Sequence, residues 1–154
     1  MVNSSFDNMI RIEYPLFPFR MKREEGKEFI FDECRRQWIR LTSEEWVRQN
    51  FLQYLLQTKK YPAALIAVEK EIRLGELKKR FDILIYNQQH QPWLMVECKA
   101  MEVPIQDEVL HQVLRYNIAV PVPYLVITNG AASFAYIRKN NQLQMLDDLP
   151  EYGI

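Results

Sequence analysis

Glycine and cysteine are scarce in this sequence of 154 residues, and neither forms a ligand-binding motif. The four glycines include no GxGxxG or GxxxxGK stretch, so we expect no phosphate-binding loop and no nucleotide cofactor in this chain. The two cysteines, Cys34 and Cys98, form no CxxC pair, which argues against a zinc cage or a disulfide framework. Cys98 is expected to fill the core as a small apolar residue.

The chain also lacks an excess of one charge and any long apolar run. Lysine plus arginine and aspartate plus glutamate each number 20, so net charge provides no general attraction to nucleic acids or acidic membranes. No stretch approaches the roughly 20 apolar residues that span a bilayer, and the first ten residues do not resemble a signal peptide. We therefore expect a cytoplasmic protein with no membrane partner, in which any site for a polyanion is local.

The length and the apolar fraction of 48% are typical of one globular domain. Thr42 and Glu45 have the form of a helix-capping box, and apolar residues then recur at helical spacing up to "YPAA". A second helix is expected from about Ile105 to Ala119. Strands are expected in "ALIAVEKEIRL", "RFDILIY", "WLMVECKA", "YLVITNG", "SFAYIRK" and "LQMLDD".

This order of elements predicts an α+β fold in a single domain over residues 1–154. Residues 1–41 would be an N-terminal decoration with a hairpin in "FRMKREEGKEFIF". Residues 42–137 would form the core, and residues 138–154 a C-terminal strand and tail. On the strand "ALIAVEKEIRL", Ile66, Val68 and Ile72 would share one face.

Two acids and a lysine on neighbouring predicted strands form the most informative pattern. If residues 87–92 form the turn, Tyr86 lies opposite Trp93 and Asp82 lies opposite Glu97 on one sheet face. Period-two alternation places Lys99 on that face as well. The opposite face would be apolar throughout, with Ile83, Ile85, Leu94, Val96 and Cys98.

Carboxylates that face each other repel, so a positive charge must balance them. Lys99 alone could do so in an exposed salt bridge, worth about 0 to 1 kcal/mol. A divalent cation could also do so, because Mg²⁺ commonly binds one or two carboxylates together with water and substrate phosphate. Such a metal polarises a phosphodiester and lowers the pKa of a bound water, which a lysine can orient. The second interpretation predicts phosphodiester hydrolysis.

The residues "D…ECK", formed by Asp82, Glu97 and Lys99, resemble the signature of the PD-(D/E)XK nuclease superfamily. The ordered blocks "LTSEEWVRQ", "YP…VEKEI", "KRFDILIY", "VECKA", "QVLRYN" and "ITNG" are similar to the N-terminal nuclease domain of the type I restriction enzyme R subunit, over roughly residues 30–137. The resemblance implies a restriction-endonuclease-like core of three layers, α/β/α-like, with a central mixed sheet. It also implies Mg²⁺-dependent cleavage of DNA, with Mn²⁺ as a substitute.

By this resemblance, Asp82 and Glu97 would be the metal ligands and Lys99 the catalytic lysine. The family has a further glutamate on the first helix, which would be Glu45, with Glu44 as the alternative; the capping box explains Glu45 equally well.

The remaining site residues implied by the resemblance lie on the second helix and near its end. Gln112 and Tyr116 match the family's Gln-x-x-x-Tyr motif, whose spacing places both on one helix face, although both could simply line the rim of a packed helix. Thr128 and Asn129 would border the same cleft. Contacts to nucleic acid are expected from Arg48, Arg80, Arg115 and Asn129.

The run "ELKKRF" contains Lys78, Lys79 and Arg80 and has the composition of a solvated sheet edge. If the nuclease site is present, the alternative is that this run contacts phosphates. Glu69 is expected at a solvated strand position, with an accessory acid as the alternative.

The sequence departs from the family at two points. Phe81 stands where the family usually has proline, and no helicase motor follows in this sequence. We therefore expect DNA as a partner, together with a separate motor or specificity subunit, or a second copy in a homodimer. A non-catalytic binding module on the same fold, for nucleic acid or protein, is the competing hypothesis.

Overall fold

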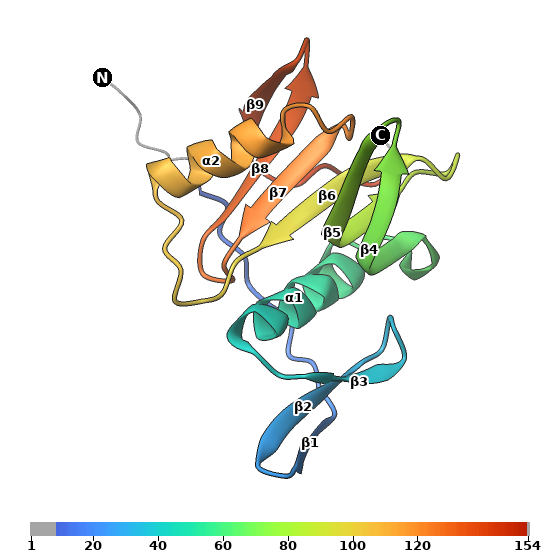
Figure 1. The fold of residues 1–154 in the computed structure, drawn as a ribbon, viewed down its shortest axis with the longest axis vertical. Coiled ribbons are helices and arrows are strands. Elements are labelled where there is room, and N and C mark those ends of the chain that lie inside the picture. The colour runs from blue at the N-terminus through green and yellow to red at the C-terminus, as the bar shows by residue number, and fades with distance from the viewer. Residues whose placement is uncertain (1–8, 154) are drawn as a thin grey trace.

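The structure, a computed structural model, describes residues 9–153, and its centre is a six-stranded sheet (Figure 1). The strands follow each other across the sheet in the order of the chain, and neighbours are antiparallel except for β6 and β7, which are parallel. The crossover between these two strands contains a helix, as parallel neighbours require. The strands are β4 (Ile66–Leu74), β5 (Leu77–Tyr86), β6 (Pro92–Cys98), β7 (Tyr124–Thr128), β8 (Ser133–Lys139) and β9 (Gln142–Leu146).

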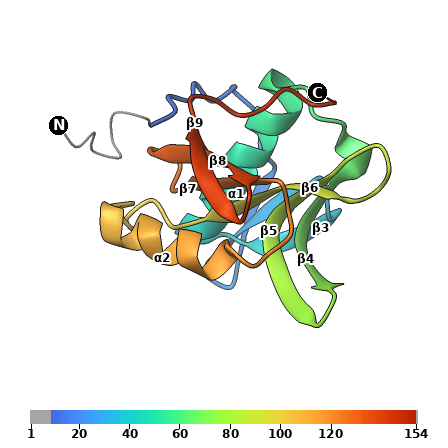
Figure 2. The ribbon, with the colours of Figure 1, turned by 90° about the horizontal axis from the view of Figure 1, so that it is seen from above.

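One helix covers each face of this sheet, so the α+β class and the mixed central sheet are confirmed (Figure 2). Helix α1 (Ser43–Gln53) continues into a π-helical turn over Tyr54–Thr58, and α2 (Asp107–Asn117) joins β6 to β7. The α1-side core includes Val47, Phe51, Val68, Ile83, Ile85, Leu94, Val96 and Cys98. The α2-side core includes Phe81, Leu84, Met95, Leu110, Val113, Leu125, Ile127 and Phe134.

The start of α1 confirms half of the expected capping box. Thr42 is the N-cap, and its hydroxyl accepts a hydrogen bond from the backbone N–H of Glu45 over 3.0 Å. The carboxylate of Glu45 does not return the bond to the cap, because it is turned toward the guanidinium groups of Arg35 and Arg48. Charged donors bind a carboxylate more strongly than a backbone N–H does, which explains this choice.

A separate three-stranded antiparallel sheet lies below α1 in Figure 1. It consists of β1 (Met21–Glu24), β2 (Lys27–Asp32) and β3 (Gln37–Arg40). The predicted hairpin is thus confirmed, and its two turn residues, Glu25 and Gly26, both have positive φ, as a tight hairpin turn of this hand requires. Strand β3, which is only four residues long, was not predicted from the sequence. No helix in the described residues is long and apolar enough to cross a membrane.

The register between β5 and β6 agrees with the expectation in the middle of the strands and differs at the turn. The register that pairs Tyr86 with Trp93 would also pair Leu84 with Met95, and the structure has this second pair, but Tyr86 lies opposite Pro92 and not Trp93. A bulge directly before Tyr86 shifts the register by one residue, so the turn is shorter than expected.

The alternation of β4 and β5 breaks at the position where Glu69 and Asp82 would face each other. Glu69 has φ 52°, a left-handed conformation that is uncommon for residues other than glycine. Before this point Val68 packs in the α1-side core, whereas Ile72 beyond it packs against the α2-side core. The expectation that these two share a face is therefore wrong. On β5, Phe81 likewise packs in the α2-side core, although a regular strand would place it on the face of Ile83.

Candidate active site

Asp82 lies at this break, and both of its carboxylate oxygens are engaged. Oδ1 accepts a hydrogen bond from Nη2 of Arg48 on α1 over 3.0 Å. Oδ2 accepts one from the backbone N–H of Cys98 on β6 over 2.8 Å. The acid is thus fixed between a helix and the neighbouring strand, with 16% of its side chain exposed.

Glu97 on β6 is held by a lysine that the sequence analysis assigned to a solvated edge. Nζ of Lys79 lies 2.8 Å from Oε1 of Glu97 and 4.8 Å from the ring centroid of Tyr116. Only 5% of the Lys79 side chain is exposed, so the expectation of a solvated position is wrong. The reason is the break in alternation, which turns Lys79 and Phe81 toward α2. In a regular strand, Lys79 would point to the other face, away from Glu97.

The charges around Glu97 act on its protonation. Burial raises the pKa of Glu97, Lys79 lowers it, Asp82 raises it and Lys99 lowers it, and the net effect is a raised pKa. Asp82 and Lys99 are therefore close enough to Glu97 for their charges to matter. The three residues of the expected signature form one electrostatic group.

A cleft of about 380 Å³ opens between this group and α2. It is lined by Glu97, Lys99, Gln112 and Tyr116, together with Val109, Val113 and Asn117. The structure thus brings the Gln-x-x-x-Tyr residues to the same cleft as the acid and the lysine. Lys99 is half-buried there, and within residues 9–153 its ammonium group has no ion pair or hydrogen bond.

The two helix acids have different surroundings. Glu45 is buried, and its carboxylate accepts hydrogen bonds from Arg35, Arg48 and Gln49. Glu44 is exposed at the edge of the site. Partial burial raises its pKa, and the nearby charge of Asp82 raises it further, while Arg48 lowers it. Arg48 pairs with Glu44, Glu45 and Asp82, so both candidate acids lie close to Asp82, but Glu44 is the one that is exposed.

Arg48 connects these acids. With 7% of its side chain exposed, it pairs with Glu45, with Asp82 and, over 2.8 Å, with Glu69. Because the guanidinium group of Arg48 is buried and paired with these acids, it holds them in position. Little of its surface remains accessible to a phosphate, so the expected contact of Arg48 with nucleic acid is not supported.

Glu69 is part of this network and not the solvated strand residue that was expected. Its second oxygen lies 2.7 Å from Nε of Arg80. Burial alone would raise the pKa of Glu69, but Arg80 and Arg48 outweigh it, and the pKa is lowered. Arg80 itself remains 61% exposed beside the site, where a phosphate can reach it.

Of the two remaining residues expected to contact nucleic acid, Arg115 is exposed and Asn129 is buried. Arg115 is exposed on the last turn of α2. Asn129 is buried: its amide donates to the carbonyl of Val103 and accepts from the backbone of Ala131 and Ala132. Thr128 is likewise bonded to Ser133. The "ITNG" stretch therefore shapes the turn between β7 and β8.

The comparison with protein families agrees with this arrangement. A family model described as type I restriction enzyme R protein N terminus (HSDR_N) matches residues 43–150. The chain belongs to this family. The match spans α1, α2 and the whole six-stranded sheet, and it begins after β3. No curated protein matches the chain significantly.

The Mg²⁺ implied by the resemblance to nucleases can be tested against the side chains of this R protein N-terminal domain. Among residues 9–153, no group of three or more histidine, cysteine, aspartate or glutamate side chains is arranged to hold a metal. Asp82 and Glu97 supply two carboxylates from adjacent strands, a donor set that fits a hard cation completed by water and phosphate. In the described part of the chain, Oε2 of Glu97 has no hydrogen bond. A cation at this position would bind carboxylates that already have basic partners, namely Asp82, which is bound to Arg48, and Glu97, which is bound to Lys79.

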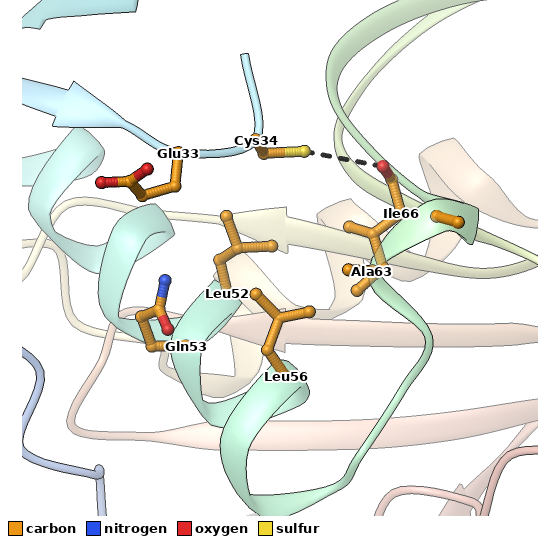
Figure 3. A pocket seen from close by; sticks show the side chains of 8 residues that line it. Glu33, Cys34, Leu52, Gln53, Leu56, Ala63 and Ile66 are labelled. Atoms are coloured by element: carbon orange, nitrogen blue, oxygen red, sulfur yellow. Dashed lines mark hydrogen bonds between the residues drawn. The ribbon is translucent and has the colours of Figure 1, made fainter. Parts of the chain in front are cut away.

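A second hollow of this R protein N-terminal domain lies away from the acids. About 370 Å³ in volume, it sits between the turn that follows β2, the end of α1 and the start of β4 (Figure 3). Its mostly apolar wall includes Leu52, Leu56 and Ile66, and Sγ of Cys34 lies 3.6 Å from the carbonyl oxygen of Ile66. Burial raises the pKa of the Cys34 thiol, so the nucleophilic thiolate is disfavoured. None of the expected site residues lines this hollow.

Proposed function

We propose that this member of the R protein N-terminal family is a divalent-metal-dependent nuclease domain that hydrolyses phosphodiester bonds in DNA. The observation that carries the proposal is that Glu97, Lys99, Gln112 and Tyr116 line one cleft. Asp82 lies close enough for its charge to raise the pKa of Glu97. Asp82 and Glu97 lie on neighbouring strands, Lys99 directly follows β6, and Gln112 and Tyr116 lie on α2. A cleft on which titratable and polar groups from separate elements converge is the usual candidate for an active site.

In this proposal, Asp82 and Glu97 bind the cation and Lys99 acts on the attacking water. A cation bound there would polarise the phosphodiester and lower the pKa of a bound water. Within residues 9–153 the ammonium group of Lys99 forms no ion pair or hydrogen bond, so it can orient the water and offset the charge that develops on the phosphate. Arg48 and Lys79 hold the two acids in place.

The test is cleavage of supercoiled plasmid with Mg²⁺ or Mn²⁺ by the parent, Asp82→Asn and Lys99→Met. We expect each variant to lose roughly 10²- to 10⁴-fold in rate, the range typical of removing one group that acts on the reacting atoms. The matched control is Lys78→Met, because Lys78 is 63% exposed and pairs with Glu71 outside the cleft. Equal rates in the parent, Asp82→Asn and Lys99→Met would refute the assignment.

One observation favours a non-catalytic binding module instead. Arg48 and Lys79 already balance Asp82 and Glu97, so the acids do not require a metal for charge compensation. Calorimetric titration with Mn²⁺ separates the two functions. The nuclease proposal predicts binding that Glu97→Ala abolishes, whereas a parent that binds no Mn²⁺ would favour the module.

The family name also bears on partners. Because R proteins are named as parts of a restriction enzyme, we propose that DNA and a further subunit, either a motor or a specificity protein, interact with this domain. Co-purification with the products of neighbouring reading frames tests this proposal, and a second copy of the chain is the alternative partner.

A further inference from the structure

The outward face of the three-stranded sheet carries aromatic and cationic side chains in alternation. Lys22, Phe29 and Arg40 lie directly opposite one another across β1, β2 and β3, and Phe31 lies opposite Trp38. Residues in opposite positions share a sheet face, and positions two apart on one strand share it too. These five side chains therefore form one surface, which we call the aromatic face.

The aromatic face points away from the body of the protein. On the other face of the same sheet, Ile30 and Asp32 are completely buried. By contrast, Trp38 is 37% exposed, and Phe29 and Phe31 are only partly covered. An aromatic row on the solvent side of a small sheet adds nothing to the central core, so its composition needs another explanation.

The rings and the cations of this face are in contact. The guanidinium carbon of Arg20, just before β1, lies 3.9 Å from the ring centroid of Phe31. Nζ of Lys22 lies 4.7 Å from the ring centroid of Trp38. The rings of Phe31 and Trp38 are 5.3 Å apart and tilted by 45°. These cation–π contacts stabilise the sheet, and they also place positive charge directly beside planar apolar surface.

The charge balance of the face differs from that of the chain. Against a net charge of zero overall, the face carries Arg20, Lys22, Lys27 and Arg40. Two acids accompany them, Glu24 at 3.0 Å from Lys22 and Glu33 at 4.0 Å from Arg20, which still leaves an excess of positive charge. Phosphate is complementary to this excess of positive charge, and nucleobases are complementary to exposed rings. A single strand presents both at once, whereas a duplex keeps its bases stacked inside.

We propose that the aromatic face binds single-stranded nucleic acid with little sequence preference. Bases would stack on Trp38 and Phe31, and the arginine and lysine side chains would neutralise phosphates. Stacking is tolerant of sequence because every base has a planar face. The proposal goes beyond the nuclease function, since the face lies outside residues 43–150 and shares no residue with the cleft of Glu97 and Lys99.

The test is fluorescence anisotropy of a labelled oligothymidylate of about 20 nucleotides, long enough for one binding site, with the full chain, in chelator and at low salt. We expect the parent to bind, and Trp38→Ala to bind roughly 5- to 100-fold more weakly, the loss typical of one stacked base. Lys22→Ala should weaken binding and reduce its salt dependence. The matched control is Arg23→Ala, which removes a cation from the same strand but from the other face. It should leave the affinity within about twofold of the parent, as expected when no phosphate contact is lost.

Two further arms make the outcome decisive. Oligouridylate of equal length shows whether the face accepts RNA as well as DNA, and a duplex of equal length should bind more weakly than either single strand. Circular dichroism checks the fold of each variant, and Lys22→Glu, at a partly exposed position, replaces Trp38→Ala if the latter does not fold. Equal affinity of parent and folded variants, or preference for the duplex, would overturn the proposal. Because chelator is present throughout, inactivity as a nuclease does not affect this measurement.

Discussion

Glu45 and Glu44 are adjacent acids on α1, and replacement by glutamine should destabilise the protein at Glu45 and leave its stability almost unchanged at Glu44. Glu45 is 4% exposed at its side chain and accepts from Arg35, Arg48 and Gln49, whereas Glu44 is 48% exposed. Glu45→Gln keeps the size of the side chain and removes its charge. It therefore isolates the contribution of the buried ion pairs from that of packing.

The expected loss follows from the partners that remain. Removing one member of a buried ion pair costs about 3 to 5 kcal/mol, because the other charge is left uncompensated. Here Arg35 keeps Asp32 at 2.6 Å, and Arg48 keeps Asp82 at 3.0 Å. We therefore expect the lower end of the range, about 3 kcal/mol in the free energy of unfolding.

Urea denaturation measures this loss. With a slope of about 2 kcal/mol per molar urea, the midpoint of Glu45→Gln should fall by about 1.5 M. Glu44→Gln should change the free energy of unfolding by less than about 0.5 kcal/mol, as an exposed acid does. Equal destabilisation by the two variants, or an unchanged midpoint in Glu45→Gln, would refute the assignment of Glu45 as the buried member of the ion-pair network.

Two further changes test the cap of α1 and the Lys79–Glu97 pair. Thr42→Ala should cost about 1 kcal/mol in urea denaturation through loss of the N-cap, and a neutral result would contradict the cap. Lys79→Met should move the titration of Glu97, followed by carbon-13 NMR of its carboxyl group, to higher pH, because Lys79 opposes the effect of burial; a midpoint that stays or falls would contradict the ion pair. Since the pKa of Glu97 is raised in the folded state, the stability that its protonated form contributes is present at low pH and is lost as the pH rises through that pKa. Because the pKa of Glu44 is also raised, urea denaturation across this range should show a smaller decline in Glu97→Gln than in the parent.

Local signals in the sequence were sufficient for most of the fold. Helical spacing and the Thr42 cap predict α1, and the apolar strands with their turns predict the six-stranded sheet. The middle of the β5–β6 register was also predicted, although from a turn over residues 87–92 that is one residue too long, because a one-residue slip would have moved Asp82 to the apolar face of Ile83 and Val96. The short β3 was missed, since four residues carry too little alternation to be distinguished from a loop.

The candidate site was only partly predictable, for a different reason. Asp82, Glu97 and Lys99 follow from a motif along the chain, but the position of Lys79 depends on a backbone irregularity in the adjacent strand. Nothing in the letters around Glu69 requires a left-handed conformation, because that conformation is usually associated with glycine or asparagine. Which of Glu44 and Glu45 is buried depends in part on Arg35, which binds the carboxylate of Glu45. Arg35 lies in the turn between β2 and β3, so the helical spacing of α1 gives no information about this contact.

The left-handed Glu69 has a consequence for anyone who wishes to transplant this constellation into another scaffold. A designer who copied Asp82, Glu97 and Lys99 onto an ideal hairpin would reproduce the letters of the motif. The supporting Lys79 would then face the wrong layer, and Glu97 would lose its partner. The minimal portable unit is therefore a pair of strands with its irregularity intact, and β4, which contributes no member of the motif, must be included in the graft.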